Sequence, residues 1–229
     1  MSEQVQQMFA SIAPTYDSTN TVLSMGVHHL WRNRAVALSG AAAGQSVLDC
    51  ATGTGDLALT FKHKVGATGR VVGTDFCAEM LAPAPAKAAA KGLEVEWAVA
   101  DAMHLPYDDN TFDVASISFG IRNVDDPVVC LREMARVVRP GGRVVVVEFG
   151  QPRGLFGALY RFYSFQVMPL VGGLMSGNRQ AYSYLPRTSA AFPAGDDFLS
   201  LMDRSGGFSQ RVGHPQTMGI TWIYVGTVA

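Results

Sequence analysis

The stretch that decides the fold of this chain is Val47-Leu48-Asp49-Cys50-Ala51-Thr52-Gly53-Thr54-Gly55-Asp56. Its apolar start predicts a buried strand. The two glycines predict a tight turn, because residues without a Cβ accept backbone conformations that others avoid. Asp56 predicts the first turn of a helix, where a carboxylate is favourable. A strand, a glycine turn and a helix are typical of nucleotide-binding α/β proteins. Gly53-x-Gly55-x-x-Ala58 also fits a dinucleotide fingerprint, so the ligand stays open here, and a plain tight turn remains an alternative.

Composition indicates a globular protein with a full core. The chain has 229 residues, 48% hydrophobic and 16% charged, with a net charge of −1. The near-zero charge argues against a nucleic-acid partner. The three cysteines form no C-x-x-C pair, so neither a disulfide framework nor a zinc site is expected. We expect a cytoplasmic location for the same reason. The first residues lack the features of a signal peptide. Residues 155–175 are apolar but broken by Pro169 and Gly172, so they predict a buried insertion or an apolar lid rather than a membrane span.

Acids close three successive expected strands. Asp49, Asp75 and Asp101 are spaced by 26 and again 26 residues, the length of one βα unit. The ends of parallel strands meet at one edge of a sheet, where ligands bind. At that edge, Asp75 is placed to accept both ribose hydroxyls of an adenosine. The alternative for Asp75 is an N-cap of the next helix.

Hydrophobic periodicity predicts one α/β unit. The expected strands are 46–51, 70–75, 93–100, 112–119 and 143–149, followed by a hairpin of 208–212 and 217–225 that turns at Gly213-His214-Pro215. The expected helices are 4–12, 20–25, 28–38, one from Asp56, 77–91, 126–138 and 196–202, with two more helical pieces in 152–194. We expect a single domain over 1–229, with 1–40 as a helical N-terminal cap and 152–194 as an insertion or lid.

Five βα units followed by an antiparallel hairpin resemble class I S-adenosylmethionine (SAM)-dependent methyltransferases. Dinucleotide dehydrogenases instead continue with parallel strands. Asp49 within the first strand favours the same class, because an acid near the glycine turn suits a cationic ligand with an amino-acid end. The predicted fold is therefore a seven-stranded Rossmann-like methyltransferase sheet with a C-terminal antiparallel hairpin.

Four stretches are similar to the ubiquinone/menaquinone biosynthesis C-methyltransferase family, over nearly the full chain. They are Tyr16-Asp17-x-x-Asn20-x-x-x-Ser24-x-Gly26-x-His28-x-x-Trp31, the glycine turn, Ser118-Phe119-Gly120-Ile121-Arg122-Asn123-Val124 with Arg136-Val137-Val138-Arg139-Pro140-Gly141-Gly142, and the late Tyr182-x-Tyr184-Leu185 with Phe192-Pro193. Two departures are Thr52, where the family more often has glycine or another small residue, and His29, where arginine is usual.

The resemblance implies methyl transfer from SAM to a ring carbon of a polyprenylated quinol, a demethylmenaquinol or the benzoquinol of the ubiquinone pathway. It implies that SAM is lined by Asp49, Gly53, Thr54, Gly55, Asp75, Asp101, Ala102 and Ser118, with Asp101 and the Ala102 N–H at the adenine. The candidates for the chemistry are Arg122, Asn123 and Tyr16, with His28 and His104 for positioning or proton relay. Arg122 would stabilise a phenolate by its charge, because arginine does not act as a base.

Purely structural roles are alternatives for Arg122, Tyr16 and the two histidines: a salt bridge of Arg122 to Asp125 or Asp126, a capping aromatic at Tyr16, and surface or capping histidines. No metal is expected, because the histidines and acids lack ligand spacing. The expected partners are the lipophilic quinol, the inner face of a membrane by peripheral contact, and a second copy of the chain. The alternative functions are O- or N-methylation of another small molecule, an NAD-dependent dehydrogenase, and a scaffold without activity.

Overall fold

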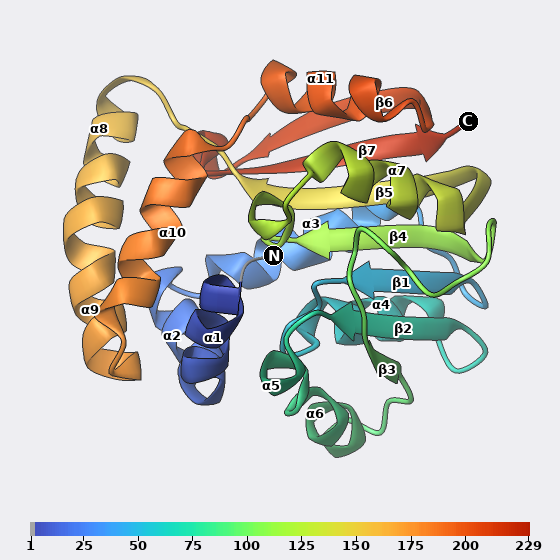
Figure 1. Ribbon diagram of the computed structural model, residues 1–229, viewed down its shortest axis with the longest axis horizontal. Helices are drawn as coiled ribbons and strands as arrows, with labels where there is room; N and C mark the ends of the chain where they lie inside the picture. The colour runs from blue at the N-terminus through green and yellow to red at the C-terminus, as the bar shows by residue number, and fades with distance from the viewer. Residues whose placement is uncertain (1–2) are drawn as a thin grey trace.

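The computed structural model describes residues 3–229, and the first two residues of the expected cap, 1–2, lie outside it. A seven-stranded sheet in the order β3-β2-β1-β4-β5-β7-β6 runs through its centre (Figure 1). Five strands are parallel: β1 (Ser46–Cys50), β2 (Arg70–Asp75), β3 (Glu96–Val99), β4 (Phe112–Ser118) and β5 (Val138–Phe149). The last two, β6 (Phe208–Gln216) and β7 (Thr221–Val228), are antiparallel. The predicted sheet and its antiparallel hairpin are confirmed.

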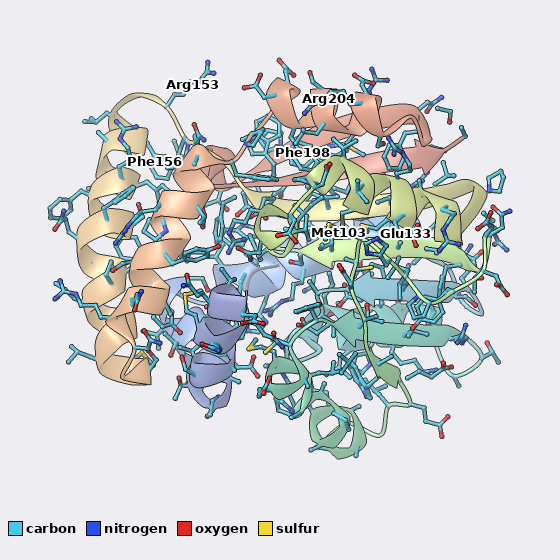
Figure 2. The ribbon with its side chains drawn as sticks, in the orientation of Figure 1. Met103, Glu133, Arg153, Phe156, Phe198 and Arg204 are labelled. Carbon is cyan, nitrogen blue, oxygen red and sulfur yellow. The ribbon has the colours of Figure 1, made fainter. Side chains whose placement is uncertain are left out.

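Helices cover both faces of the sheet. On one face lie α3 (Val27–Ser39) and α4 (Asp56–Val65), and on the other α7 (Pro127–Val137) and α11 (Asp196–Ser205). Phe198 of α11, labelled in Figure 2, is fully buried and stacks on Tyr224 of β7, with ring centroids 4.2 Å apart. Two short helices, α5 (Ala78–Leu81) and α6 (Ala84–Ala90), lie between β2 and β3.

A third layer of helices stands beyond the carboxyl ends of the parallel strands (Figure 1). It consists of α1 (Glu3–Ile12), α2 (Tyr16–Leu23), α8 (Gly154–Phe162), α9 (Met168–Ser176) and α10 (Arg179–Ala191). Three short 3₁₀ helices join other elements: η1 (Ala13–Thr15), η2 (Ile121–Asn123) and η4 (Thr217–Gly219). The π-helical segment η3 (Tyr163–Val167) connects α8 to α9. The small core of this layer includes Ile12, Leu23, Met168 and Tyr182. It packs the N-terminal helices α1 and α2 against α9 and α10.

Several expected boundaries are wrong for local reasons. The hairpin turns at Thr217–Gly219 and not at Gly213-His214-Pro215, because Pro215 is tolerated in β6, an edge strand. β5 already begins at Val138, since residues 139–142 bulge out between two registers with β4. Helix 77–91 is interrupted at Pro83, which lacks the N–H that a continuous helix needs.

Other differences concern length. The third strand is shorter than the expected 93–100. The insertion forms two helical pieces, a continuous run of α8, η3 and α9 and then α10, but they are separated at Gly177-Asn178 and not at Pro169 and Gly172-Gly173. Tyr16 and Asp17, expected in a loop, begin α2. That last difference matters for the site, because a helix fixes the directions of both side chains.

Candidate active site

The glycine turn lies at the point where the strand order reverses. β1 pairs with β2 on one side and with β4 on the other, so its carboxyl end opens into the crevice between them. Ligands of open α/β sheets bind at such a crevice. Ala51 and Phe119, which follow β1 and β4, both have positive φ angles, 48° and 56°. Non-glycine residues rarely adopt this conformation, and it is concentrated at functional sites.

A small pocket of about 80 Å³, the inner pocket, lies at this crevice. Its lining includes five of the predicted cofactor residues, Gly53, Asp75, Asp101, Ala102 and Ser118. The lining also includes Phe9 and Tyr16 from the third layer of helices, together with Phe119 and Asn123.

Asp75 holds the glycine turn and the segment before α5, and the alternative role of an N-cap is wrong because the N-cap of α5 is Cys77. One carboxylate oxygen accepts the Gly53 N–H at 2.8 Å, and the other accepts the Cys77 N–H at 2.8 Å, at the start of α5. Each carboxylate oxygen can accept a further hydrogen bond, so the side chain that holds the glycine turn can also bind a ligand hydroxyl. Burial raises the pKa of Asp75, and the backbone hydrogen bonds oppose that shift.

Three predicted cofactor residues do not line the inner pocket. Asp49 lies behind the turn, where its carboxylate accepts the hydroxyls of Thr52 and Ser116, each at 2.6 Å. Burial raises the pKa of Asp49 to about 6. Gly55 has a φ of +87°, and a Cβ there would lie 2.6 Å from the Trp97 ring. Gly55 is thus required by packing against Trp97, whereas Gly53 faces the pocket.

Thr54, the third of these residues, joins a network of charges on the far side of the turn. Its hydroxyl donates to Asp17 of α2 at 2.6 Å. Lys87 of α6 donates to Asp17 at 2.6 Å, to Thr54 at 3.1 Å and to Asp56 at 2.5 Å. Arg32 of α3 pairs with Asp56 at 3.0 Å. The network ties the glycine turn to the N-terminal helices. No local motif indicates it, because its members are far apart in the chain.

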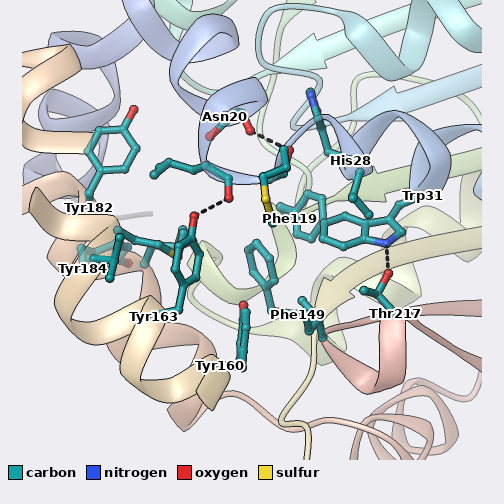
Figure 3. Close-up of a pocket in the computed structure, with 18 of the residues that line it drawn as sticks. Asn20, His28, Trp31, Phe119, Phe149, Tyr160, Tyr163, Tyr182, Tyr184 and Thr217 are labelled. Carbon is teal, nitrogen blue, oxygen red and sulfur yellow. Dashed lines mark hydrogen bonds between the residues drawn. The ribbon is translucent and has the colours of Figure 1, made fainter. Parts of the chain in front are cut away.

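A much larger cavity of about 630 Å³, the outer cavity, lies under the third layer of helices (Figure 3). Aromatic and aliphatic side chains dominate its lining, among them Trp31, Phe149, Phe156, Tyr160, Tyr163, Tyr182, Tyr184 and Leu185. Phe9, Tyr16 and Phe119 line both the inner pocket and the outer cavity, so these two spaces adjoin. Burial raises the pKa of Tyr16, which keeps its phenol protonated at neutral pH.

Arg122 lines the outer cavity and is held by a buried ion pair. Its Nη1 donates to Glu148 at 2.9 Å and to the Phe119 carbonyl at 2.5 Å. The side chains of Arg122 and Glu148 are only 4% and 1% exposed. Within residues 3–229, Arg122 Nε and Glu148 Oε2 are buried without a hydrogen-bond partner. Glu148 was not among the predicted site residues, although a lone carboxylate within the apolar strand 143–149 was a signal for it.

The other polar candidates divide between the two spaces and the surface. Asn123 lines the inner pocket, and its Oδ1 accepts the Tyr184 hydroxyl at 3.1 Å. His28 lines the outer cavity, where burial and then the neighbouring Arg32 lower its pKa to about 4. His104 has a side chain that is 80% exposed, 3.4 Å from Asp101, and it lines neither space.

Among residues 3–229, no group of three or more histidines, cysteines, aspartates and glutamates is placed to hold a metal ion. The same part of the chain contains no helix that is long and apolar enough to cross a membrane.

The sheet order, the antiparallel last strands and the acids at the glycine turn define a class I SAM-dependent methyltransferase fold. A solved SAM-dependent methyltransferase from Thermotoga maritima superposes with a TM-score of 0.69 at 18% identity, over 97% of this chain and 99% of that chain. The model of the ubiE/COQ5 methyltransferase family matches residues 1–228, and the chain belongs to this family.

Curated relatives agree with that assignment. A ubiquinone/menaquinone biosynthesis C-methyltransferase of Bdellovibrio bacteriovorus is 58% identical over 99% of this chain and 96% of its own length. A demethylmenaquinone methyltransferase of Thermus thermophilus is 49% identical over 96% of this chain and 99% of its own length. The predictions of an enzyme, of a SAM-dependent methyltransferase and of this family are confirmed. The dehydrogenase and the scaffold without activity are not supported.

Proposed function

We propose that this protein transfers the methyl group of SAM to a ring carbon of a prenylated quinol in quinone biosynthesis. The observation that carries the proposal is the junction of the two spaces: a polar pocket at the strand ends adjoins a large apolar cavity through Tyr16 and Phe119. The family membership and the names of both relatives support the same activity.

The inner pocket has the groups that SAM needs. Asp75 can accept ribose hydroxyls, and Asp101 can accept the adenine amino group while the Ala102 backbone lies beside the ring. Gly53 lets the backbone approach the ligand, and Ser118 and Asn123 close the other side. We assign Asp49, Thr54 and Gly55 a supporting role, because their contacts hold the turn rather than line the pocket.

The outer cavity suits the acceptor. At about 630 Å³ it lies within the size range of small-molecule sites, and its lining is largely apolar. The polar groups in the lining include Tyr16, His28 and Arg122, which can orient the ring oxygens of the acceptor.

The chemistry requires alignment and charge stabilisation. SAM supplies the methyl group as an electrophile, and the net change replaces a ring C–H by C–CH₃ with release of one proton. Arg122 stabilises the negative charge of the quinol oxygen as its proton leaves, which raises electron density at the ring carbon. Glu148 keeps the guanidinium oriented, and Tyr16 fixes the ring beside the inner pocket. Correct alignment can supply roughly 7–11 kcal/mol of the barrier.

The direct test offers the purified protein SAM with demethylmenaquinol or the demethylated benzoquinol and identifies the product by mass spectrometry. A product with a new C–CH₃ group supports the proposal and decides between the two rings. Transfer only to an oxygen or nitrogen of another acceptor would favour the alternative of an O- or N-methyltransferase.

The mouth of the outer cavity indicates where the prenyl tail goes. Met25, Leu159 and Phe162 line the cavity and are also exposed, and Leu155 and Leu174 extend the same apolar surface along α8 and α9. The segment 152–194 contains four arginines and no acid, whereas the whole chain carries −1. Apolar residues beside positive charge favour an anionic membrane surface. We therefore propose that 152–194 is a lid that contacts the cytoplasmic face of a membrane, where the substrate tail lies.

Vesicle binding tests this contact. Leu159→Glu is expected to weaken binding to vesicles that contain phosphatidylglycerol and to slow turnover of long-tailed quinols. The matched control is Val99→Glu, because Val99 of β3 is 60% exposed and Leu159 is 65% exposed. Equal binding of both variants would contradict the membrane contact. Light scattering on the same samples tests the predicted homodimer.

A further inference from the structure

The proposed cofactor has one charged group that the inner pocket does not serve. SAM carries an α-carboxylate at its methionine end. The described lining of the inner pocket includes the acids Asp75 and Asp101 and contains no lysine or arginine. A carboxylate brought out of water requires a cation or several hydrogen-bond donors. The methionine end must therefore reach a cation beside the glycine turn.

Two of the three nearby cations are already engaged. The ammonium of Lys87 has three donors, and it meets three acceptors, on Asp17, Thr54 and Asp56. Arg122 belongs to the outer cavity, where it is paired with Glu148 and lies over the Phe149 ring. Lys87 therefore has no free donor, and the charge of Arg122 is compensated by its own buried partner Glu148, whereas Asp56, the partner of Arg32, is shared with Lys87.

Arg32 is the remaining cation, and most of its donors are free. A guanidinium has five N–H donors. Only Nη1 of Arg32 is engaged within residues 3–229, with Asp56 at 3.0 Å and His29 at 3.5 Å. Nε and Nη2 have no acceptor in that part of the chain, and the side chain lines the outer cavity.

The position of Arg32 fits the methionine end. Asp56, its partner, directly follows Gly55 of the glycine turn. Burial raises the pKa of Tyr16, which lines the inner pocket, and of Asp49, which precedes the turn, and the charge of Arg32 acts against both shifts. Arg32 thus lines the outer cavity and is paired with the residue that follows the glycine turn.

We propose that Arg32 binds the α-carboxylate of SAM through its free N–H groups while Nη1 stays with Asp56. The planar guanidinium matches a carboxylate with two parallel hydrogen bonds, which a lysine cannot reproduce. Arg32 is then the residue by which α3 of the N-terminal cap recognises the amino-acid end of the cofactor. The inference rests on the proposed cofactor but not on the quinol acceptor.

Calorimetry with two nucleosides tests it without any turnover. S-adenosylhomocysteine has the amino-acid end, and 5′-methylthioadenosine lacks it. Arg32→Ala is expected to weaken S-adenosylhomocysteine about 10- to 100-fold, the loss typical of a charged hydrogen bond, and to change methylthioadenosine binding less than about twofold. Arg34→Ala, an exposed position on the same helix, is the matched control and should change neither.

The results distinguish a wrong role for Arg32 from a wrong cofactor. Equal weakening of both nucleosides by Arg32→Ala, or of neither, overturns the role of Arg32. If Arg32→Ala does not fold, Arg32→Lys keeps a charge beside Asp56 and gives the same comparison, with a smaller loss expected for S-adenosylhomocysteine alone. A wild-type protein that binds neither nucleoside would contradict the proposed cofactor instead, whatever the result with quinols.

Discussion

At the scale of single residues, the pair Arg122–Glu148 combines stability and chemistry. Removing one partner of a buried ion pair leaves the other charge without compensation, which costs about 3–5 kcal/mol. We expect Arg122→Met to lower the free energy of unfolding by that amount, measured with urea. The double variant Arg122→Met with Glu148→Gln should recover most of it, because the buried charge is gone.

The single variant Arg122→Met and the double variant are expected to lose activity to the same extent. Loss of the charge that stabilises the quinol oxygen should lower kcat by about 10²–10³-fold in both, with little change in the KM for SAM. A double variant that regained both stability and kcat would show that Arg122 has only a structural role.

His28 gives a residue-scale prediction about pH. Its pKa is lowered to about 4 in the folded protein by burial and by Arg32, against 6.5 in the unfolded chain. The unfolded state therefore binds more protons between these values, so His28 makes folding less favourable as the pH falls from about 6.5 to 4. The full difference corresponds to about 3 kcal/mol.

Comparison with His28→Gln isolates this effect. Asp49 acts with the opposite sign in a similar window, since its pKa of about 6 favours its protonated form on folding. That contribution is common to both proteins and cancels in their difference. Urea unfolding at pH 7, 5.5 and 4.5 should show the wild type losing more stability than the variant, and parallel losses would refute the assignment.

At the scale of elements, the charge network decides how α2 and α6 meet the glycine turn. Burial opposes ionisation of Asp56, but Arg32 and then Lys87 outweigh it and lower its pKa. We expect Lys87→Met to lower the free energy of unfolding by about 1–3 kcal/mol, because it removes charged hydrogen bonds and leaves Asp17 close to Asp56. Amide hydrogen exchange in α2 should become faster.

The exposed pair Arg70–Glu96 provides the control for that variant. It joins β2 to β3 at 2.7 Å, but the side chains of Arg70 and Glu96 are 41% and 58% exposed. Arg70→Met should cost at most about 1 kcal/mol. Equal losses from Lys87→Met and Arg70→Met would mean that the network at the glycine turn is an ordinary surface feature.

At the scale of the whole molecule, ligand binding should identify the cofactor class. A ligand at 100 times its Kd stabilises the folded state by about 2.7 kcal/mol, which raises the Tm of a protein of this size by roughly 5–10 °C. S-adenosylhomocysteine is expected to produce this shift and NAD none, as measured by thermal unfolding. A shift with NAD alone would restore the dehydrogenase alternative.

Local patterns were sufficient for most of the sheet. The glycine turn, the acids after the strands and the period-2 and apolar runs predicted the parallel strands and the antiparallel end. The errors occurred where neighbours override local preference. Pro215 continues an edge strand, residues 139–142 bulge within β5, and Tyr16 begins a helix because α2 packs in the third layer.

The sequence by itself determined the class of fold, the position of the glycine turn and the family, because each depends on local motifs and on their order along the chain. Only the tertiary structure decided which of those residues face a ligand. Gly53 lines the inner pocket while Gly55 packs on Trp97, and Asp49 lies behind the turn. The pairing of Arg122 with Glu148 and the free donors of Arg32 also depend on contacts across the fold, which hydrophobic periodicity does not encode.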